Sequence, residues 1–72
     1  MTLNQRKTYL MVTMADFLMS KWHKNIQEFL QLDLHYGILD YLILCYEPFH
    51  LTGEEGIAQE VEQFIREQGG VV

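Results

Sequence analysis

Few side chains in this sequence have types and spacings that could support chemistry. The strongest metal ligands are three histidines and one cysteine, which lie at His23, His35, His50 and Cys45. Structural zinc sites draw four such ligands from closely spaced pairs, and these residues share no such spacing. We therefore expect no metal site and no bound cofactor.

The acidic residues do not form a recognisable catalytic arrangement. Glu54 and Glu55 are paired in sequence, but neighbours on a helix point to different sides, and acidic residues at a helix start stabilise its positive end. No nucleophile–base pair, glycine-rich phosphate loop or dinucleotide fingerprint is present. We expect no catalytic residues and a protein that is not an enzyme.

Charge is distributed unevenly along the chain, whose net charge is −5. Residues 1–24 contain four basic residues and one acidic residue, a net charge of +3, whereas residues 25–72 contain one basic and nine acidic residues, a net charge of −8. The acidic part could meet a basic protein partner or could serve solubility alone. As a candidate partner-binding face we single out Glu54, Glu55, Glu62 and Glu67.

Binding to nucleic acid is disfavoured, because an acidic protein repels phosphate backbones. The segment 25–49 could be a helix-turn-helix, but its second helix has no basic residue to offer to bases. The alternative function that stays open is a nucleic-acid-binding transcriptional regulator, which would use the basic N-terminal region with Arg6, Lys7, Lys21 and Lys24.

Length limits the fold to one domain over residues 1–72, with a small core and marginal stability. Self-association would help such a chain, and Tyr9, Trp22, Tyr36 and Tyr41 cannot all be buried in one small core. No export signal is visible, and no apolar run approaches the roughly 18 residues that cross a bilayer. With a single cysteine, expected to be a buried core residue, we predict a soluble cytoplasmic protein.

Hydrophobic periodicity predicts an all-α fold, a compact bundle of four short helices at about 4–21, 25–35, 38–49 and 53–68. In the first helix, an apolar stripe includes Met14 and Leu18. Three methionines in this helix suit either an adaptable binding surface or, as we favour, an irregular core; they are Met11, Met14 and Met19.

The second helix has a clear start and end. Asn25 and Glu28 have the spacing of a capping box, and Gly37 suits a left-handed helix end. Its predicted core face consists of Ile26, Phe29, Leu30 and Leu34, with Gln27, Gln31 and Asp33 on the opposite side.

The third helix, 38–49, is apolar on most sides and is predicted to lie at the centre of the bundle. Pro48 should kink or end it within one turn. Thr52 and Glu55 have capping-box spacing before the fourth helix, whose core stripe is Ile57, Ala58, Val61, Phe64 and Ile65, and Gly69-Gly70 should end that helix.

The second half of the chain resembles a small bacterial family of proteins, the domain of unknown function thirty-seven ninety-one. The resemblance rests on the run from Tyr36 to Leu42 (YGILDYL), Tyr46 with His50 four residues later, the Thr52-Gly53-Glu54 segment and a closing acidic helix. The first half matches only in pattern, and Pro48 departs from the usual aliphatic or polar residue.

Genes of this family often lie beside genes for toxin-like proteins similar to ADP-ribosyltransferases. The resemblance thus implies an antitoxin-like or accessory role. Together with the acidic, helical character of the chain, it leads us to expect a non-catalytic protein-interaction module with a protein partner, and self-association as a further expectation.

Overall fold

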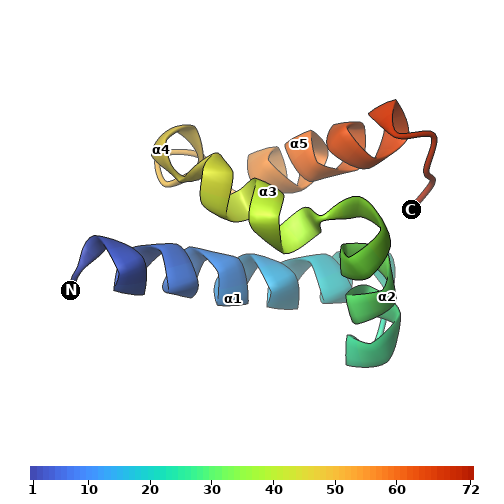
Figure 1. Cartoon of the computed structure of the whole chain (residues 1–72), viewed down its shortest axis with the longest axis horizontal. Helices are drawn as coiled ribbons and strands as arrows, with labels where there is room; N and C mark the ends of the chain where they lie inside the picture. Colours follow the sequence, from blue (N-terminus) through green and yellow to red (C-terminus); the bar gives the residue numbers. More distant parts are fainter.

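The computed structural model describes all residues 1–72 and consists of helices without strands. In chain order the helices are α1 (Leu3–Trp22), α2 (Ile26–Tyr36), α3 (Ile38–Leu44), α4 (Tyr46–Phe49) and α5 (Glu54–Glu67). Figure 1 shows α1 along one side of the molecule, with α3 and α5 opposite it and α2 turning across the end where α1 stops. The predicted all-α class is confirmed, but there are five helices and not four.

The starts and ends of α1 and α2 follow from local hydrogen bonding. At the start of α2, the Asn25 side chain accepts the Glu28 N–H at 2.8 Å, while the Glu28 carboxylate accepts the Asn25 N–H at 2.9 Å. Gly37 ends α2 in the left-handed conformation at φ 72°, which glycine adopts without steric cost. Both predictions are confirmed. An unpredicted capping box between Thr2 and Gln5 opens α1.

The predicted third helix is divided at Cys45, where φ is −98° and ψ is 22°. Pro48 explains the division, because it has no N–H to donate to the carbonyl of Leu44, four residues earlier. The chain therefore closes α3 at Leu44 and makes a single further turn, α4, that ends at Phe49. The expected effect of Pro48 within one turn is confirmed, whereas a continuous helix over 38–49 is wrong.

The predicted capping box between Thr52 and Glu55 is also wrong. Gly53 occupies the capping position of α5 and makes no side-chain cap. The Thr52 hydroxyl instead donates to the carbonyl of Pro48 at 2.9 Å, since Thr52 follows directly on the turn that ends α4. Glu54 and Glu55 still lie in the first turn of α5, where negative charge is favourable.

The C-terminal end of α5 is closed by paired backbone bonds. Gly69 adopts the left-handed conformation at φ 85°. Its N–H donates to the Arg66 carbonyl, and the Gly70 N–H donates to the Ile65 carbonyl. This is the Schellman arrangement, in which a left-handed residue satisfies two helix carbonyls. Gly70 is buried, and a side chain there would meet the ring of Tyr36.

The core lies where α1, α3 and α5 face one another. Ten buried residues form one cluster, drawn from all five helices: Met14, Leu18, Phe29, Ile38, Leu42, Phe49, Ile57, Ala58, Val61 and Ile65. α3 contacts α1, α2, α4 and α5, which explains why it is apolar on most sides. The radius of gyration, 11.5 Å, is close to the roughly 11 Å expected for a compact chain of this length. Cys45 is only half-buried at the edge of this core, which corrects its predicted burial.

The predicted core face of α2 is mostly exposed. Phe29 is buried and stacks near Trp22, but Ile26, Leu30 and Leu34 are 55%, 49% and 84% exposed. Apolar residues occur on more than half of the circumference of α2, so periodicity alone does not define which part packs inward. In the fold, α2 turns Phe29, Leu32 and Tyr36 inward and leaves the other three outward.

Asp33 was placed on the polar side of α2, and its position also differs. Its carboxylate accepts the backbone N–H of Leu39 at 2.8 Å and so satisfies one of the free donors at the start of α3. This bond links α2 to α3 across Gly37.

Candidate protein-binding surface

Two of the four predicted partner-binding glutamates are engaged within the molecule. Lys21, at the end of α1, forms ion pairs with both Glu55 and Glu62 of α5, the latter at 3.2 Å. Glu62 also accepts the indole N–H of Trp22 at 2.9 Å. Its side chain is 18% exposed, so it does not face outward as the sequence suggested. These contacts connect the last turn of α1 to α5.

The pKa values of this cluster shift in the directions that its contacts dictate. Burial alone would raise the pKa of Glu62, but the hydrogen bonds from Trp22 and Lys21, with the positive charge of Lys21, lower it below 4.5. The hydrogen bond to Glu55 is the largest influence on Lys21 and, together with Glu62, raises its pKa above 10.5. Both shifts favour the charged forms.

The other two glutamates do not join Glu55 and Glu62 on one face. Glu54 is at the exposed start of α5, and Glu67 is near its end on the opposite flank, as 100° per residue requires. Glu67 and Glu60 contribute to the raised pKa of Tyr41, whose main cause is burial of the phenol. The four glutamates therefore do not form a single acidic patch. Their role in partner binding stays a prediction.

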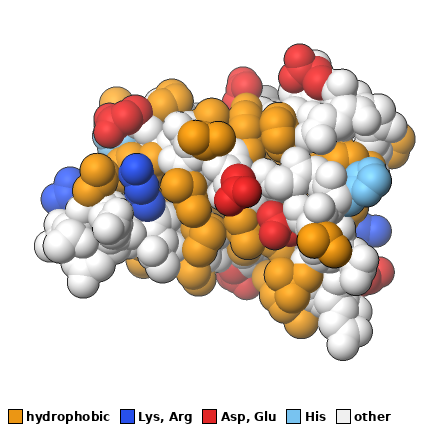
Figure 2. Space-filling model, in the orientation of Figure 1, with side chains coloured by type: hydrophobic (Ala, Val, Ile, Leu, Met, Phe, Trp, Pro, Cys, Tyr) orange, Lys and Arg blue, Asp and Glu red, His pale blue; other side chains and the backbone are white.

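The basic residues are dispersed as well. Arg6 and Lys7 are near the start of α1, and Lys21 is about 22 Å further along it. In Figure 2 the lysine and arginine side chains visible on this face lie towards its ends. Because Lys21 is neutralised by two carboxylates, the four cations do not form one patch that could follow a phosphate backbone.

The histidines and Cys45 are in separate places. His23 follows the end of α1 in a left-handed conformation at φ 57°, His35 packs edge-on against Tyr36, and His50 stacks on Tyr46. No group of three or more histidine, cysteine, aspartate or glutamate side chains is placed to hold a metal ion.

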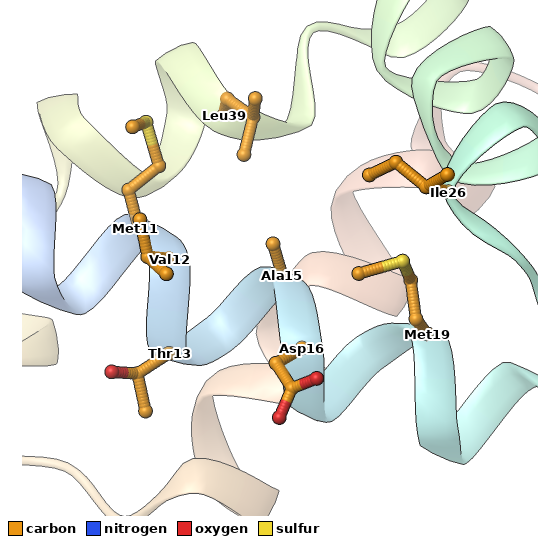
Figure 3. Close-up of a pocket in the computed structure, with 8 residues that line it drawn as sticks. All are labelled: Met11, Val12, Thr13, Ala15, Asp16, Met19, Ile26 and Leu39. Atoms are coloured by element: carbon orange, nitrogen blue, oxygen red, sulfur yellow. The ribbon is translucent and has the colours of Figure 1, made fainter.

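One feature of the surface that could receive a ligand is an apolar groove of about 540 Å³. Six of its eight lining residues are hydrophobic, and they come from α1, the start of α2 and α3; the eight are Met11, Val12, Thr13, Ala15, Asp16, Met19, Ile26 and Leu39. In Figure 3 the side chains of Met11, Ala15 and Met19 extend from α1 towards Leu39, Ile26 closes one end, and Asp16 points away. The groove has an apolar floor and no lysine or arginine in its lining.

The methionines of α1 therefore serve two purposes. Met14 is fully buried in the core, as favoured from the sequence, whereas Met11 and Met19 are half-buried and line the groove. Ala15 lies between Met11 and Met19 on the same side of α1. Because its side chain is short, the middle of the groove stays open. Met11, Ala15 and Met19 recur every four residues, and this spacing was a signal for a separate apolar face of α1 beside the core face.

A second apolar surface adjoins the groove. Ile26, Leu30 and Leu34 follow one another along the outer side of α2, and Ile26 belongs to both surfaces. Figure 2 shows hydrophobic side chains at the surface between the helices and again over the region of α2. Contiguous exposed apolar surface is typical of protein-binding sites.

Comparison with protein families gives one match. The model of the family described as proteins of unknown function, DUF3791, matches residues 8–68, which is most of the chain. The chain belongs to this family. The match to DUF3791 covers α1 from its second turn through α5, so it includes the groove and the α2 surface. Comparison with curated proteins and with solved structures finds no match. No helix of this DUF3791 member is long and apolar enough to cross a membrane.

Proposed function

We propose that this protein is a non-catalytic protein-interaction module that binds a partner protein in the groove between α1 and α3. The observation that supports this most directly is the lining: Met11, Ala15, Met19 and Leu39 present an apolar floor at the surface. Methionine side chains adapt to different shapes, which suits a binding surface. Grooves of this kind receive the apolar face of an amphipathic helix.

Charge favours a partner with basic residues flanking its apolar positions. Asp16 is exposed at the outer rim of the groove, with its side chain directed away from the apolar floor, and no basic side chain lines the groove, while the chain as a whole has a net charge of −5. A basic segment would be attracted to this surface and an acidic one repelled. Glu54 and Glu67, the members of the predicted acidic set that form no ion pair within the molecule, could extend this attraction.

The biological role that we propose is antitoxin-like or accessory, exercised on the product of a neighbouring gene in the bacterial cytoplasm. Its support is the gene arrangement that is usual for the family and the free thiol of Cys45, which suits a reducing compartment. A nucleic-acid-binding role has no comparable support, because Arg6 and Lys7 are far from Lys21 and Lys24 along the chain.

Co-expression with the neighbouring gene product, followed by purification, tests the proposal. The pair should co-purify, and Ala15→Glu, which places a charge on the groove floor, should weaken the complex at least tenfold, a loss of about 1.4 kcal/mol. Ser20→Glu adds the same charge at an exposed position of α1 outside the groove lining and should leave the complex unchanged.

Two results would contradict the proposal. Failure of the pair to co-purify would show that this partner does not bind. Equal binding by the Ala15→Glu and Ser20→Glu variants would show that the groove is not the binding site. Reversal of charge at Glu54 and Glu67 should weaken binding in a salt-dependent manner. Unchanged affinity would exclude these two glutamates from the contact.

A further inference from the structure

A smaller depression lies between the first three turns of α1 and the single turn of α4, and we call it the α1–α4 pocket. Figure 1 shows α4 over the N-terminal half of α1. The pocket has a volume of about 240 Å³ and is lined by Met1, Arg6, Tyr9, Leu10, Thr13, Tyr46 and His50. Sites for drug-sized ligands span roughly 300–1,000 Å³, so this pocket suits a smaller ligand, about one ring with its substituent.

Tyr46 brings an unpartnered hydroxyl to this pocket. Its side chain is only 7% exposed, and its ring stacks on His50 with the ring centroids 4.9 Å apart. A buried tyrosine hydroxyl usually has a hydrogen-bond partner, but this one has none within the molecule. Because no fully buried polar side-chain atom lacks a partner, the hydroxyl must reach the surface, and the pocket is the surface that Tyr46 lines. The fold thus holds a donor in place where only a bound molecule or solvent can meet it.

Arg6 gives the pocket a positive charge. Both ion pairs of the chain are made by Lys21, so no carboxylate of the molecule neutralises the Arg6 guanidinium. No aspartate or glutamate lines the pocket, and Glu47, the acidic residue of α4, is outside the lining. A guanidinium has a planar fork of N–H donors that matches the oxygens of a carboxylate or a phosphate. The charge therefore favours an anion here, although the chain as a whole is acidic.

The remaining lining defines the rest of the ligand. The Nδ1 atom of His50 is 3.1 Å from the carbonyl oxygen of Tyr46, and since a carbonyl only accepts, Nδ1 carries the proton of that bond. Its Nε2 atom is left without a partner in the molecule. Leu10 and the rings of Tyr9 and Tyr46 supply apolar walls, which suit an aromatic or aliphatic body.

We propose that the α1–α4 pocket binds a small organic anion, with an apolar body of about one ring and a carboxylate or phosphate group held by Arg6 and the Tyr46 hydroxyl. This site is additional to the proposed function, because neither Arg6 nor Tyr46 lines the groove. For a ligand of about ten non-hydrogen atoms we expect a dissociation constant on the order of 1 mM.

Titration of the full chain with phenyl phosphate and with benzoate, each to about 10 mM and followed by nuclear magnetic resonance, tests the site. The backbone amide signals of Arg6, Tyr46 and His50 should shift and saturate. Tighter binding of phenyl phosphate assigns the site to phosphate esters, and tighter binding of benzoate assigns it to carboxylates. Benzyl alcohol has the same ring without the charge and should bind at least tenfold more weakly than the better anion.

Two variants test the residues that hold the anion. Tyr46→Phe removes only the hydroxyl and should weaken binding about tenfold. Arg6→Gln removes the charge and should weaken it by at least the same factor. Lys7→Gln is the matched control, because Lys7 is the next residue of α1 and is outside the lining, and it should bind like the unaltered chain. Circular dichroism measures whether each variant retains its helix content.

Four results would overturn the pocket as an anion site. They are the absence of saturable shifts with both anions, equal binding of benzyl alcohol, unchanged binding by a folded Tyr46→Phe variant, and equal losses in Arg6→Gln and Lys7→Gln. The last would show that net charge alone attracts the anion. No partner protein takes part in these measurements, so their failure leaves the proposed function standing, and failure of co-purification leaves the pocket standing.

Discussion

The contact of Glu62 with Trp22 and Lys21 gives the sharpest test of how this small fold is stabilised. Glu62 joins α5 to the end of α1 through a hydrogen bond of 2.9 Å from the Trp22 indole and an ion pair of 3.2 Å with Lys21. Its side chain is 18% exposed, so solvent screens it only in part. Hydrogen bonds to charged groups contribute about 1.5–3 kcal/mol when they are shielded from water.

Removal of the carboxylate should therefore be costly. Glu62→Ala leaves the indole N–H and Lys21 without this acceptor, and we expect a loss of about 2 kcal/mol of unfolding free energy, which for a chain of this size lowers Tm by roughly 10 °C. Glu62→Gln retains an acceptor for the indole but removes the charge, and should lose about half as much. Urea unfolding followed by circular dichroism measures both.

The pH dependence provides an independent measurement. The pKa of Glu62 is lowered in the folded state, so its contribution is present above its unfolded value of 4.5 and is lost as the pH falls through the folded value. The difference in stability between the unaltered chain and Glu62→Gln should thus be constant near neutral pH and should shrink below about pH 4.5.

Glu60→Ala is the control, because Glu60 is exposed on the same helix and should cost less than about 0.5 kcal/mol. The reasoning is refuted if Glu62→Ala is no less stable than Glu60→Ala. It is also refuted if the difference between the unaltered chain and Glu62→Gln is the same in acid as at neutral pH.

Three further predictions concern the backbone, the phenol and the end of α1. Gly70→Ala places a Cβ only 2.5 Å from the Tyr36 ring and should lose about 1–3 kcal/mol of unfolding free energy, measured in urea. At Gly53 an added Cβ meets nothing within 4 Å, so Gly53→Ala should lose less than about 1 kcal/mol. Equal losses in the two variants would contradict this. Burial raises the pKa of Tyr41, so the phenol's contribution to stability is present below pH 10.0 and is lost as the pH rises through the folded-state pKa. The stability of Tyr41→Phe should therefore depend less on pH in the alkaline range. An unchanged alkaline dependence would exclude the phenol as its source. His23→Gly should gain roughly 0.5 kcal/mol, because glycine avoids the steric cost at φ 57° but loses more chain entropy; a lower Tm would argue against it.

The sequence predicted the elements of this fold closely where the signals are local. The starts and ends of the first and second helices and of the last helix agree with the structure to within one or two residues. Asn25, Glu28 and Gly37 act as expected because capping bonds and left-handed turns involve residues only a few positions apart. The Thr52–Glu55 box failed because α5 begins one residue later than expected, with Gly53 in place of Thr52 at the capping position.

Which charged side chains lie together on the surface was decided by the tertiary structure. Nothing in the order of residues indicates that Lys21 lies between Glu55 and Glu62, since these residues are more than 30 positions apart and meet only when α1 and α5 pack together. The four glutamates chosen as a contact face were selected for charge alone, and the fold separates them.

The decisive contribution of the tertiary structure concerns α2. Its sequence determines an amphipathic helix with a wide apolar arc. Phe29 was predicted to be a core residue and is buried in the structure. The angle at which α2 crosses the end of α1 then determines which part of that arc is covered. Because the neighbouring helices cover only one side, Ile26, Leu30 and Leu34 remain outside, although the sequence predicted all three as core residues.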